Sequence, residues 1–571
     1  MEFLFFFVFF YPLFMSIFWM MGAVIFFIRR ERPQRHAPKL DAYPKVAILV
    51  PCHNEERVLR DSIEQLLDND YPNFEIIAID DGSTDSTADV LAQLVQQHAR
   101  LRVVTLTRNY GKAMALRAGA LAASAEFLMC IDADALLAKD ALFWMVRHFL
   151  DGPRVGAVTG NPRVANRGGL LARIQIGEFS AIVGMVKRGQ RNLGRLFTVS
   201  GVNACYRRAA LHDVDYWSPH TVTEDIDISW KLQLKYWDIR YEPHALTWIL
   251  VPESPGPLWR QRLRWAQGGV EAAIRYFRTV NHWTSRRMWT VYTEYWLGVA
   301  WSYAFLFTVI CWVGTNLLPS AWWPAALSVP TLIPGWTGVI LALTCLAQFT
   351  VGLILDSMYE RRGLLRFLFW AIWYPAIYWL INAATTVVAV PKGAWRYNKT
   401  QYAVWRSPSR RLRDLFVWRS GPATEQRHLF VDHPFLVFSR RVTEIAVTAL
   451  FWGLWAYLIM PLISFGLWLS GVYLFVDRMI ALGGYQAFSD QLINYATATL
   501  AMWGALTFWM AWNQLRYGRH ERRTVRPPHV SEKQMAGAMG LTNETIARVR
   551  AQKTVFMHFE SEDRPIIEPA N

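Results

Sequence analysis

Carboxylate side chains stand in three short clusters, and the first follows a predicted strand. Asp80 and Asp81 come directly after the predicted strand Ile76–Ile79 and precede a Gly-Ser turn. Carboxylates at a strand end beside such a turn could accept hydrogen bonds from a ribose or a uracil base. The same residues could instead form an ordinary Asp/Gly turn that caps a helix beginning at Ser86.

The second cluster has the spacing of a metal site for a diphosphate. Asp132 and Asp134 are two positions apart and follow the apolar run Phe127–Ile131. Two carboxylates at a strand end could share a divalent cation such as Mg²⁺ or Mn²⁺, which takes its remaining ligands from substrate phosphates. That cation would offset the charge of a diphosphate and stabilise a leaving nucleotide.

The third cluster, Thr223-Glu224-Asp225, opens the helical pattern Ile226–Trp237. Thr223 could simply be an N-cap with acidic residues in the first turn. In a catalytic interpretation Asp225 is a general base that takes a proton from an acceptor hydroxyl, with Glu224 beside it. Because no second carboxylate is expected to act as a nucleophile, a single displacement would invert the anomeric centre.

A basic, Trp-rich segment contains Gln261, Arg264 and Trp265. Arg264 could bind a diphosphate in a bidentate manner, and Trp265 could offer a face on which an acceptor sugar stacks. Arg and Trp are equally typical of an interfacial helix at a membrane surface, which is the alternative for this segment taken alone.

The elements that would position these residues alternate between strands and helices from residue 44 to about 250. This alternation predicts an α/β domain with a mostly parallel sheet, in which ligands bind beyond the carboxyl ends of the strands. The predicted strands are 46–50, 75–79, 101–106 and 127–131, and the predicted helices are 55–67, 86–97 and 112–123.

The chain as a whole is too apolar for an ordinary soluble protein. Its 571 residues include 28 Trp and 33 Phe, and only 18% are charged. The first apolar block, Phe3–Ile28, is long enough to span a bilayer and is predicted to be an uncleaved anchor. The basic residues that follow it place the next domain in the cytoplasm under the positive-inside rule; they are Arg29, Arg30, Arg32 and Arg35.

The sequence predicts about six membrane segments but leaves their count open. Further spans are expected near 295–314, 336–355, 444–467 and 493–513, and Leu364–Val390 is another candidate. Three spans directly after the domain would place the basic residues from Lys392 to Arg406 outside. Either Leu364–Val390 or the proline-rich middle is then re-entrant, or one more crossing exists.

Charge and cysteine content exclude two other classes. The net charge of +15 comes from Lys and Arg beside the apolar blocks, so the sequence does not favour a nucleic-acid-binding protein. The five cysteines form no CxxC pair and are odd in number, so buried reduced thiols are expected.

The clusters occur together in the order D, DxD, TED and QxxRW, which resembles the inverting, processive members of glycosyltransferase family 2. Supporting matches are Pro51–Glu56, Gly111-Lys112-Ala113 and Ser200-Gly201. The resemblance implies a GT-A-like fold with the donor at Asn54, Glu55, Asp80, Asp81, Lys112 and Asp132. It implies a metal at Asp134 and Asp132, a base at Asp225 beside Glu224, and an acceptor and diphosphate site at Ser200, Gly201, Gln261, Arg264 and Trp265.

Within that family the chain is similar to the synthases of poly-β-1,6-N-acetyl-D-glucosamine. Asn109–Ala113 and Phe197–Gly201 carry this likeness, and Arg117 departs from it because such proteins often have Asn there. The resemblance implies UDP-N-acetylglucosamine as donor and a β-1,6-linked product translocated across a bacterial inner membrane. Synthases of the hyaluronan, chitin or cellulose type remain the enzyme alternative.

The C-terminal third is similar to the small accessory membrane subunit of those synthases, through Trp512–Tyr517 and Val555–Phe559. The chain is therefore interpreted as a fusion joined near 408–440. The resemblance implies a response to cyclic di-GMP, with candidate contacts at Arg410, Arg411, Arg413 and Arg516–Arg526, and export partners in the envelope. The domains expected are 1–30, 40–255, 256–290, 291–392, 393–440, 441–515 and 516–571.

Two further classes remain open. The chain could be a non-catalytic export channel with a vestigial sugar-binding domain, although intact carboxylates held close together argue against decay because such groups are costly to keep. It could also glycosylate a lipid once rather than polymerise, and the length of the product would decide between these two activities.

Overall fold

The computed structural model describes residues 2–31, 36–319, 322–329, 335–360, 363–374, 378–399, 401–404, 438–469, 484–517, 525–560 and 564–568. Within these residues a ten-stranded sheet has the order β10-β9-β3-β2-β1-β4-β7-β6-β8-β5. The strands are β1 (Val46–Cys52), β2 (Phe74–Asp81), β3 (Leu101–Leu106), β4 (Phe127–Cys130), β5 (Leu136–Leu137), β6 (Val155–Val164), β7 (Ala204–Arg207), β8 (Asp238–Ile249), β9 (Thr554–Phe559) and β10 (Pro565–Glu568).

The α-helices of the catalytic region are α2 (Leu59–Leu67), α3 (Thr87–Gln97), α4 (Lys112–Ala122), α5 (Ala141–Asp151), α6 (Leu170–Glu178), α7 (Met185–Leu193), α8 (Arg208–Asp213), α9 (Glu224–Leu234), α10 (Pro255–Arg275) and α11 (Phe277–Val280). A π-helix, η1 (Phe179–Gly184), joins α6 to α7, and a 3₁₀ helix, η2 (Trp283–Met288), follows α11. The other helices are α1 (Glu2–Arg30), α12 (Trp289–Leu317), η3 (Ala325–Leu327), α13 (Gly335–Ser357), η4 (Leu364–Trp370), α14 (Trp379–Arg396), α16 (Phe438–Leu469), α17 (Gly484–Tyr517), α18 (Glu532–Met539) and α19 (Asn543–Ala551).

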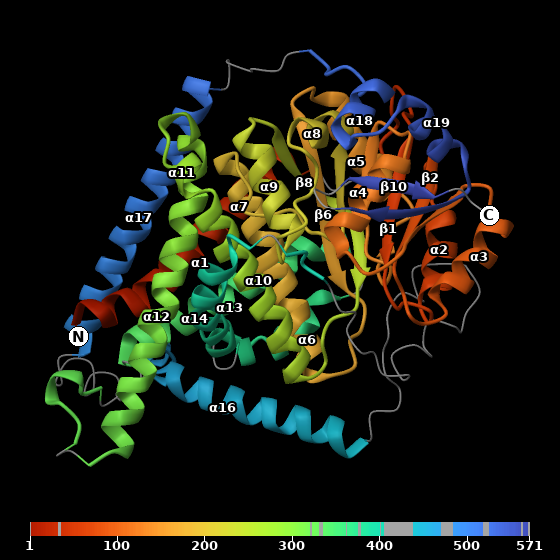
Figure 1. The fold of residues 1–571 in the computed structure, drawn as a ribbon. Coiled ribbons are helices and arrows are strands. Elements are labelled where there is room, and N and C mark those ends of the chain that lie inside the picture. Colours follow the sequence, from red (N-terminus) through yellow and green to blue (C-terminus); the bar gives the residue numbers. More distant parts are fainter. Residues whose placement is uncertain are drawn as a thin grey trace.

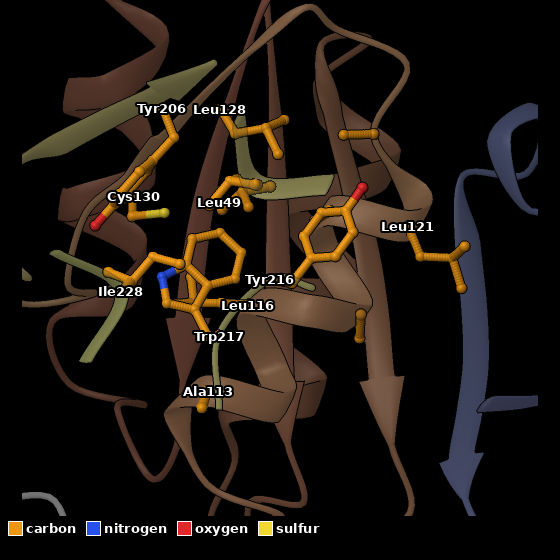
Figure 2. Packing of buried hydrophobic residues seen from close by; sticks show 14 of the residues in the cluster. Leu49, Ala113, Leu116, Leu121, Leu128, Cys130, Tyr206, Tyr216, Trp217 and Ile228 are labelled. Atoms are coloured by element: carbon orange, nitrogen blue, oxygen red, sulfur yellow. The ribbon is translucent and has the colours of Figure 1, made fainter. Parts of the chain in front are cut away.

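The predicted α/β fold is confirmed, with a GT-A-like sheet that is mostly parallel. Strands β3, β2, β1 and β4 are parallel neighbours, so their carboxyl ends meet at one edge. Both faces of β1 are buried, with Ala47 and Leu49 in one core cluster and Val46, Ile48 and Val50 in the other. A strand buried on both faces is apolar throughout, which explains its continuous apolar run. Figure 2 shows side chains of the first cluster, among them Leu49, Leu116 and Trp217, packed beside the strands.

One helix begins later than predicted. The periodicity predicts a helix from residue 55, but α2 begins at Leu59 because the chain first makes a turn at the end of β1. Asn54 has a φ of 57°, and the carbonyl of Glu55 accepts hydrogen bonds from the N–H groups of Val58 and Leu59. This turn takes the chain away from the strand end before the helix can start.

Three helices among the described residues are long and apolar enough to cross a membrane. They cover Phe3–Arg30, Trp283–Leu317 and Gly338–Ser357. The predicted segments at 444–467 and 493–513 lie in the long helices α16 and α17, at the lower and left margins of Figure 1. The count of about six crossings stays a prediction.

Leu364–Val390 does not form one continuous helix. The 3₁₀ helix η4 ends at Trp370, residues 371 and 372 form a turn, and α14 begins at Trp379. Helix α14 packs against α10 and α12, and η4 packs against α6 and α13. The alternatives for the crossings in this region stay predictions.

A buried ion-pair network joins the apolar helices to the catalytic domain. Asp356 of α13 binds Arg163 of β6 and accepts a 2.9 Å hydrogen bond from Arg188 of α7. Arg188 also binds Glu31, at the end of α1, at 2.6 Å, and Glu360 binds Arg163 at 2.9 Å. These five side chains are at most 3% exposed, so removal of one charge would leave another buried without its partner.

The C-terminal tail contributes two strands to the sheet of the catalytic domain. Its run Thr554–Phe559 is strand β9, which pairs in parallel with β3, and β10 pairs with β9. Figure 1 shows these blue elements, with α18 and α19, against the orange and red half of the sheet and α4. The C-terminal segment therefore completes the catalytic sheet.

Candidate active site

A cavity of about 1700 Å³ opens beyond the carboxyl end of β4 and extends among the apolar helices. Its wall includes candidates from the second and third clusters, from the basic segment and from the supporting matches, which are Glu55, Lys112, Asp132, Asp134, Ser200, Gly201, Glu224, Asp225, Gln261, Arg264 and Trp265. Three described candidates, Asn54, Asp80 and Asp81, do not line it. The structure thus brings residues from six separate segments of the sequence into one site.

Lys112, the first residue of α4, lies at the centre of the acidic wall. Its Nζ atom is 2.5 Å from Asp132 Oδ1 and 3.1 Å from Glu224 Oε1, and it donates to the carbonyl of Gly201 at 3.3 Å. Burial disfavours the ammonium, but the charges of Asp132 and Glu224 outweigh burial and raise the pKa of Lys112. For Glu224, Lys112 overcomes the effect of burial and lowers the pKa, so Glu224 stays a carboxylate.

Asp225, the second residue of α9, is held differently from Glu224. Its Oδ1 atom accepts a hydrogen bond from Ile226 N at 2.9 Å, and its Oδ2 atom accepts one from Gly201 N at 3.3 Å. Burial and the charge of Glu224 raise the pKa of Asp225 to about 6. A carboxylate with this pKa beside a cavity can accept a proton near neutral pH.

The capping alternative for Thr223 receives no support from its side chain. Thr223 is the N-cap of α9, but its hydroxyl makes no capping hydrogen bond. Its Oγ1 atom is buried and has no hydrogen-bond partner among the described residues. The hydroxyl faces α10 instead, where Gly268 leaves room for it.

Asp134 lines the cavity two residues beyond Asp132. Among the described residues no three His, Cys, Asp or Glu side chains gather in an arrangement that could hold a metal ion by themselves. One or two carboxylates completed by substrate phosphates is the arrangement that Mg²⁺ commonly uses. In this structure Asp132 pairs with Lys112, and a metal at Asp134 and Asp132 stays a prediction.

Helix α10 supplies one wall of the cavity. Gln261, Arg264 and Trp265 all line it, whereas Arg262 pairs with Glu178 at 2.7 Å and lies over the Trp265 ring at 4.3 Å. Arg262 therefore fixes the indole of Trp265. The Gln261 Oε1 atom is buried without a hydrogen-bond partner among the described residues, so it can accept a hydrogen bond from a sugar hydroxyl.

Gly268 sets the distance between α10 and the start of α9. A Cβ atom at Gly268 would lie 2.7 Å from Thr223 Cβ and overlap its hydroxyl. We expect Gly268→Ala to displace α10 and to lower the catalytic rate by up to about 10²-fold, because catalysis depends on positions within about 1 Å. Initial rates of product formation measure this.

Gly256→Ala is the matched control, since it adds the same methyl group near the start of α10. There the nearest heavy atom, Nη1 of the flexible Arg260 side chain, lies 3.9 Å away. Equal activity of the two variants would contradict this role of Gly268.

Asp81 is fully buried and supports the loop before α4. Its Oδ1 and Oδ2 atoms accept hydrogen bonds from the N–H groups of Tyr110 and Gly111, each at 2.8 Å. Burial raises the pKa of Asp81 to about 6. Asp80 accepts from Ser83 N at 3.1 Å, and Asn54 accepts from Thr84 N at 2.8 Å. These three residues hold turns in place, and a direct contact with the nucleotide stays a prediction.

Lys187 of α7 belongs to the cavity wall but was missed by sequence reasoning. Its Nζ atom lies 2.5 Å from Ser200 Oγ, and burial lowers the pKa of Lys187 to about 7. A lysine between Val186 and Arg188 in a mixed segment carries no signal of burial, so only the packing reveals it. The unusual Arg117 contacts Asp215 and the carbonyl of Trp217, away from the cavity.

Known proteins match the chain in two parts. A family model described as "Glycosyltransferase like family 2" matches residues 44–268, and one described as "PgaD-like protein" matches residues 431–566. Among solved structures, the chain is similar to the mannosyltransferase PcManGT from Pyrobaculum calidifontis in complex with GDP-Man and Mn²⁺. It has 20% sequence identity and a TM-score of 0.44, and the match covers 66% of this chain and 96% of that one.

Curated relatives resemble the chain over most of its length. The poly-β-1,6-N-acetyl-D-glucosamine synthase of Staphylococcus epidermidis is 38% identical over 410 residues, which cover 70% of this chain and 97% of the relative. The synthase of the same name from Staphylococcus aureus strain COL is 37% identical over 408 residues, with the same coverage. The chain therefore belongs to the poly-β-1,6-N-acetyl-D-glucosamine synthases of glycosyltransferase family 2, which makes it a hexosyltransferase, and it carries a PgaD-like segment in the same polypeptide.

Proposed function

We propose that this chain transfers N-acetylglucosamine from UDP-N-acetylglucosamine to the end of a growing β-1,6-linked polysaccharide, with inversion at the anomeric carbon. The observation that carries the proposal is that Asp132, Asp134, Asp225, Arg264 and Trp265 line one cavity. The names of the relatives supply the sugar and the linkage.

In the proposed step Asp225 is the general base. It takes the proton of the acceptor 6-hydroxyl as that oxygen attacks C1 of the donor sugar. The bond from C1 to the acceptor oxygen forms while the bond from C1 to the diphosphate oxygen breaks, and UDP leaves with the electron pair. One displacement of this kind inverts the configuration at C1.

Glu224 and Lys112 would support the base rather than replace it. Lys112 balances the charges of Asp132 and Glu224, at 2.5 Å and 3.1 Å. Glu224, which remains ionised, keeps the pKa of Asp225 above its ordinary value, together with burial. Glu224 is therefore proposed to tune Asp225 and to hold Lys112.

The activity is expected to decline in acid because a protonated Asp225 cannot accept a proton. With a pKa of about 6, Asp225 is ionised above that pH, so kcat/KM should fall about tenfold for each pH unit below it. Initial rates between about pH 5 and pH 8 measure this. An acidic limb centred near pH 4 would contradict the assignment of Asp225.

A divalent cation, Mg²⁺ or Mn²⁺, is proposed to be held by Asp134 with Asp132 beside it. Such a cation would stabilise the charge that develops on the leaving diphosphate. Chelation of divalent cations should lower polymer synthesis by about 10²-fold or more, because that stabilisation amounts to several kcal/mol. Titration with Mg²⁺ or Mn²⁺ should restore the rate, and Asp134→Asn should need a higher concentration. A full rate in the chelator would contradict a metal-dependent reaction.

The product is proposed to leave through the apolar helices of a bacterial inner membrane. The cavity continues from the carboxylates to Tyr11 of α1, Trp301 of α12 and Trp379 of α14. Aromatic faces can stack on sugar rings, so this wall suits a polysaccharide. The proposal places the catalytic domain in the cytoplasm and passes the polymer on to export partners in the envelope.

Activation by cyclic di-GMP is proposed on the basis of the PgaD-like segment. Candidate contacts Arg410, Arg411 and Arg413 lie outside the described residues, as do most of those in 516–526. Arg526 is described and pairs with Glu126 at 2.7 Å, beside the catalytic sheet. A basic flank could equally contact lipid headgroups.

The test is to supply purified chain with labelled UDP-N-acetylglucosamine and a divalent cation, and to digest the product with a hexosaminidase specific for β-1,6 linkages. Long labelled chains that the enzyme degrades are the expected result. A polymer that resists digestion would point to another linkage, and a single sugar on a lipid would contradict processive synthesis. Nucleotide binding without turnover under any effector would favour a non-catalytic channel.

A further inference from the structure

The PgaD-like segment touches the loop that leads into the active site. Strand β9 lies in parallel beside β3, with Leu106 paired to Met557, and Thr107 N donates to the carbonyl of Met557 at 3.2 Å. Val555, Met557 and Phe559 belong to the same core cluster as residues of α4. The end of β9 thus reaches the loop between β3 and α4.

Tyr110 is the point of contact within that loop. Its hydroxyl accepts a hydrogen bond from Phe559 N at 3.1 Å and donates one to the carbonyl of Phe559 at 3.4 Å. The two rings meet edge to face, with their centroids 5.4 Å apart. Because Tyr110 is 3% exposed, it can hardly move without displacing Phe559.

The backbone of Tyr110 connects this contact to the catalytic wall. The N–H groups of Tyr110 and Gly111 both donate to Asp81, and the next residue is Lys112. Gly111 has a φ of 91°, and a Cβ atom there would press on the backbone of Ala403. Asp81 on one side and the backbone of Ala403 on the other therefore restrict the loop. Lys112, the next residue, binds Asp132 and Glu224.

We infer that the C-terminal segment contributes to catalysis by positioning a residue of the active site. Phe559 is the positioning residue, and it holds Lys112 in the donor site through its contact with Tyr110 and the adjoining Gly111. The inference deepens the proposed function, on which its kinetic consequence rests. The PgaD-like segment is thus connected to the active site by the contacts of β9 with the loop between β3 and α4, without involvement of the apolar helices.

The full-length chain offers a matched pair of variants for the test. Phe559→Ala removes a side chain that is 5% exposed, whereas Phe556→Ala makes the same change on the outer face of the same strand, where the ring is 38% exposed. Phe559→Leu keeps apolar contact and serves as the conservative variant. Tyr110→Phe keeps the ring and removes both hydrogen bonds to Phe559, and it serves if Phe559→Ala does not fold.

The first measurement is hydrogen–deuterium exchange in peptides that cover residues 107–112. Phe559→Ala should speed exchange of the Tyr110 and Gly111 amides about tenfold or more, since those amides are protected only while the loop stays closed on Asp81. Phe556→Ala and Phe559→Leu should exchange close to the wild-type rate. Unchanged exchange in both Phe559→Ala and Tyr110→Phe would overturn the inference, whichever sugar the chain uses.

The second measurement separates positioning from a loss of folded protein. A smaller folded fraction lowers the apparent kcat and leaves KM unchanged. A displaced Lys112 should instead raise the KM for UDP-N-acetylglucosamine by up to roughly tenfold, because one binding interaction is weakened. If the wild type is active and all four variants share its KM, the inference about Phe559 is contradicted and the proposed function is not. An inactive wild type would contradict the proposed function, and the exchange measurement would still decide the inference.

Discussion

Replacing Asp225 with asparagine is expected to lower polymer synthesis by about 10²–10⁴-fold, the usual contribution of a positioned general base. Asparagine keeps the shape of the side chain and its hydrogen bond from Ile226, but its amide cannot take the proton of the acceptor. The measurement is the initial rate of labelled sugar incorporation by the purified full chain, with UDP binding measured in parallel.

Two controls make this prediction sharp. UDP binding by Asp225→Asn should match the wild type, since Asp225 is proposed to act on the acceptor. Asp227→Asn makes the same change two residues further along α9. The Asp227 carboxylate binds Arg275 at 3.1 Å and Tyr276 at 2.9 Å, and it does not line the cavity. That variant should reduce stability and keep the chemical step. Wild-type polymer synthesis by Asp225→Asn would remove Asp225 from the mechanism.

Replacing Arg188 with methionine is expected to reduce the free energy of unfolding by about 3–5 kcal/mol. The cost arises because Glu31 and Asp356 would remain buried without the guanidinium that now lies 2.6 Å and 2.9 Å from them. Since these residues tie α1 and α13 to α7, the loss should appear as a lower midpoint of thermal unfolding in detergent.

The comparison for this prediction is Arg278→Met, which removes an exposed arginine and should change stability by no more than about 0.5 kcal/mol. A double variant, Arg188→Met with Glu31→Gln, should recover part of the loss because Glu31 then carries no unpaired charge, while Asp356 keeps Arg163 as its partner. If Arg188→Met unfolds at the wild-type midpoint, the network does not hold the helices to the domain.

The parts of the fold that rest on local pattern could be predicted from the sequence. Strand β1 is apolar because both of its faces are buried, and this is visible as the run Val46–Val50. The carboxylates that follow β4 line the same cavity as those that begin α9. The spacing of Asp132 and Asp134 and their position after a predicted strand are therefore enough to predict that they lie at the end of β4.

The parts that rest on distant packing could not be predicted. Strand β9 pairs with a strand about 450 residues earlier, and a six-residue apolar run does not reveal its partner. The burial of Lys187 and of Asp81 depends on what packs over them. The sequence also does not predict that η4 ends at Trp370, because the apolar pattern is the same whether such a segment forms one helix or two.

The proposed reaction requires a sugar nucleotide in the cavity between Asp134 and Arg264, with the acceptor end near Trp265 and Asp225. A structure of the full chain with UDP-N-acetylglucosamine, a divalent cation and a short β-1,6-linked acceptor tests this directly. We expect the diphosphate to lie between Asp134 and Arg264 and the acceptor hydroxyl to lie within hydrogen-bond reach of Asp225. A nucleotide bound elsewhere, or an acceptor hydroxyl facing away from Asp225, would contradict it.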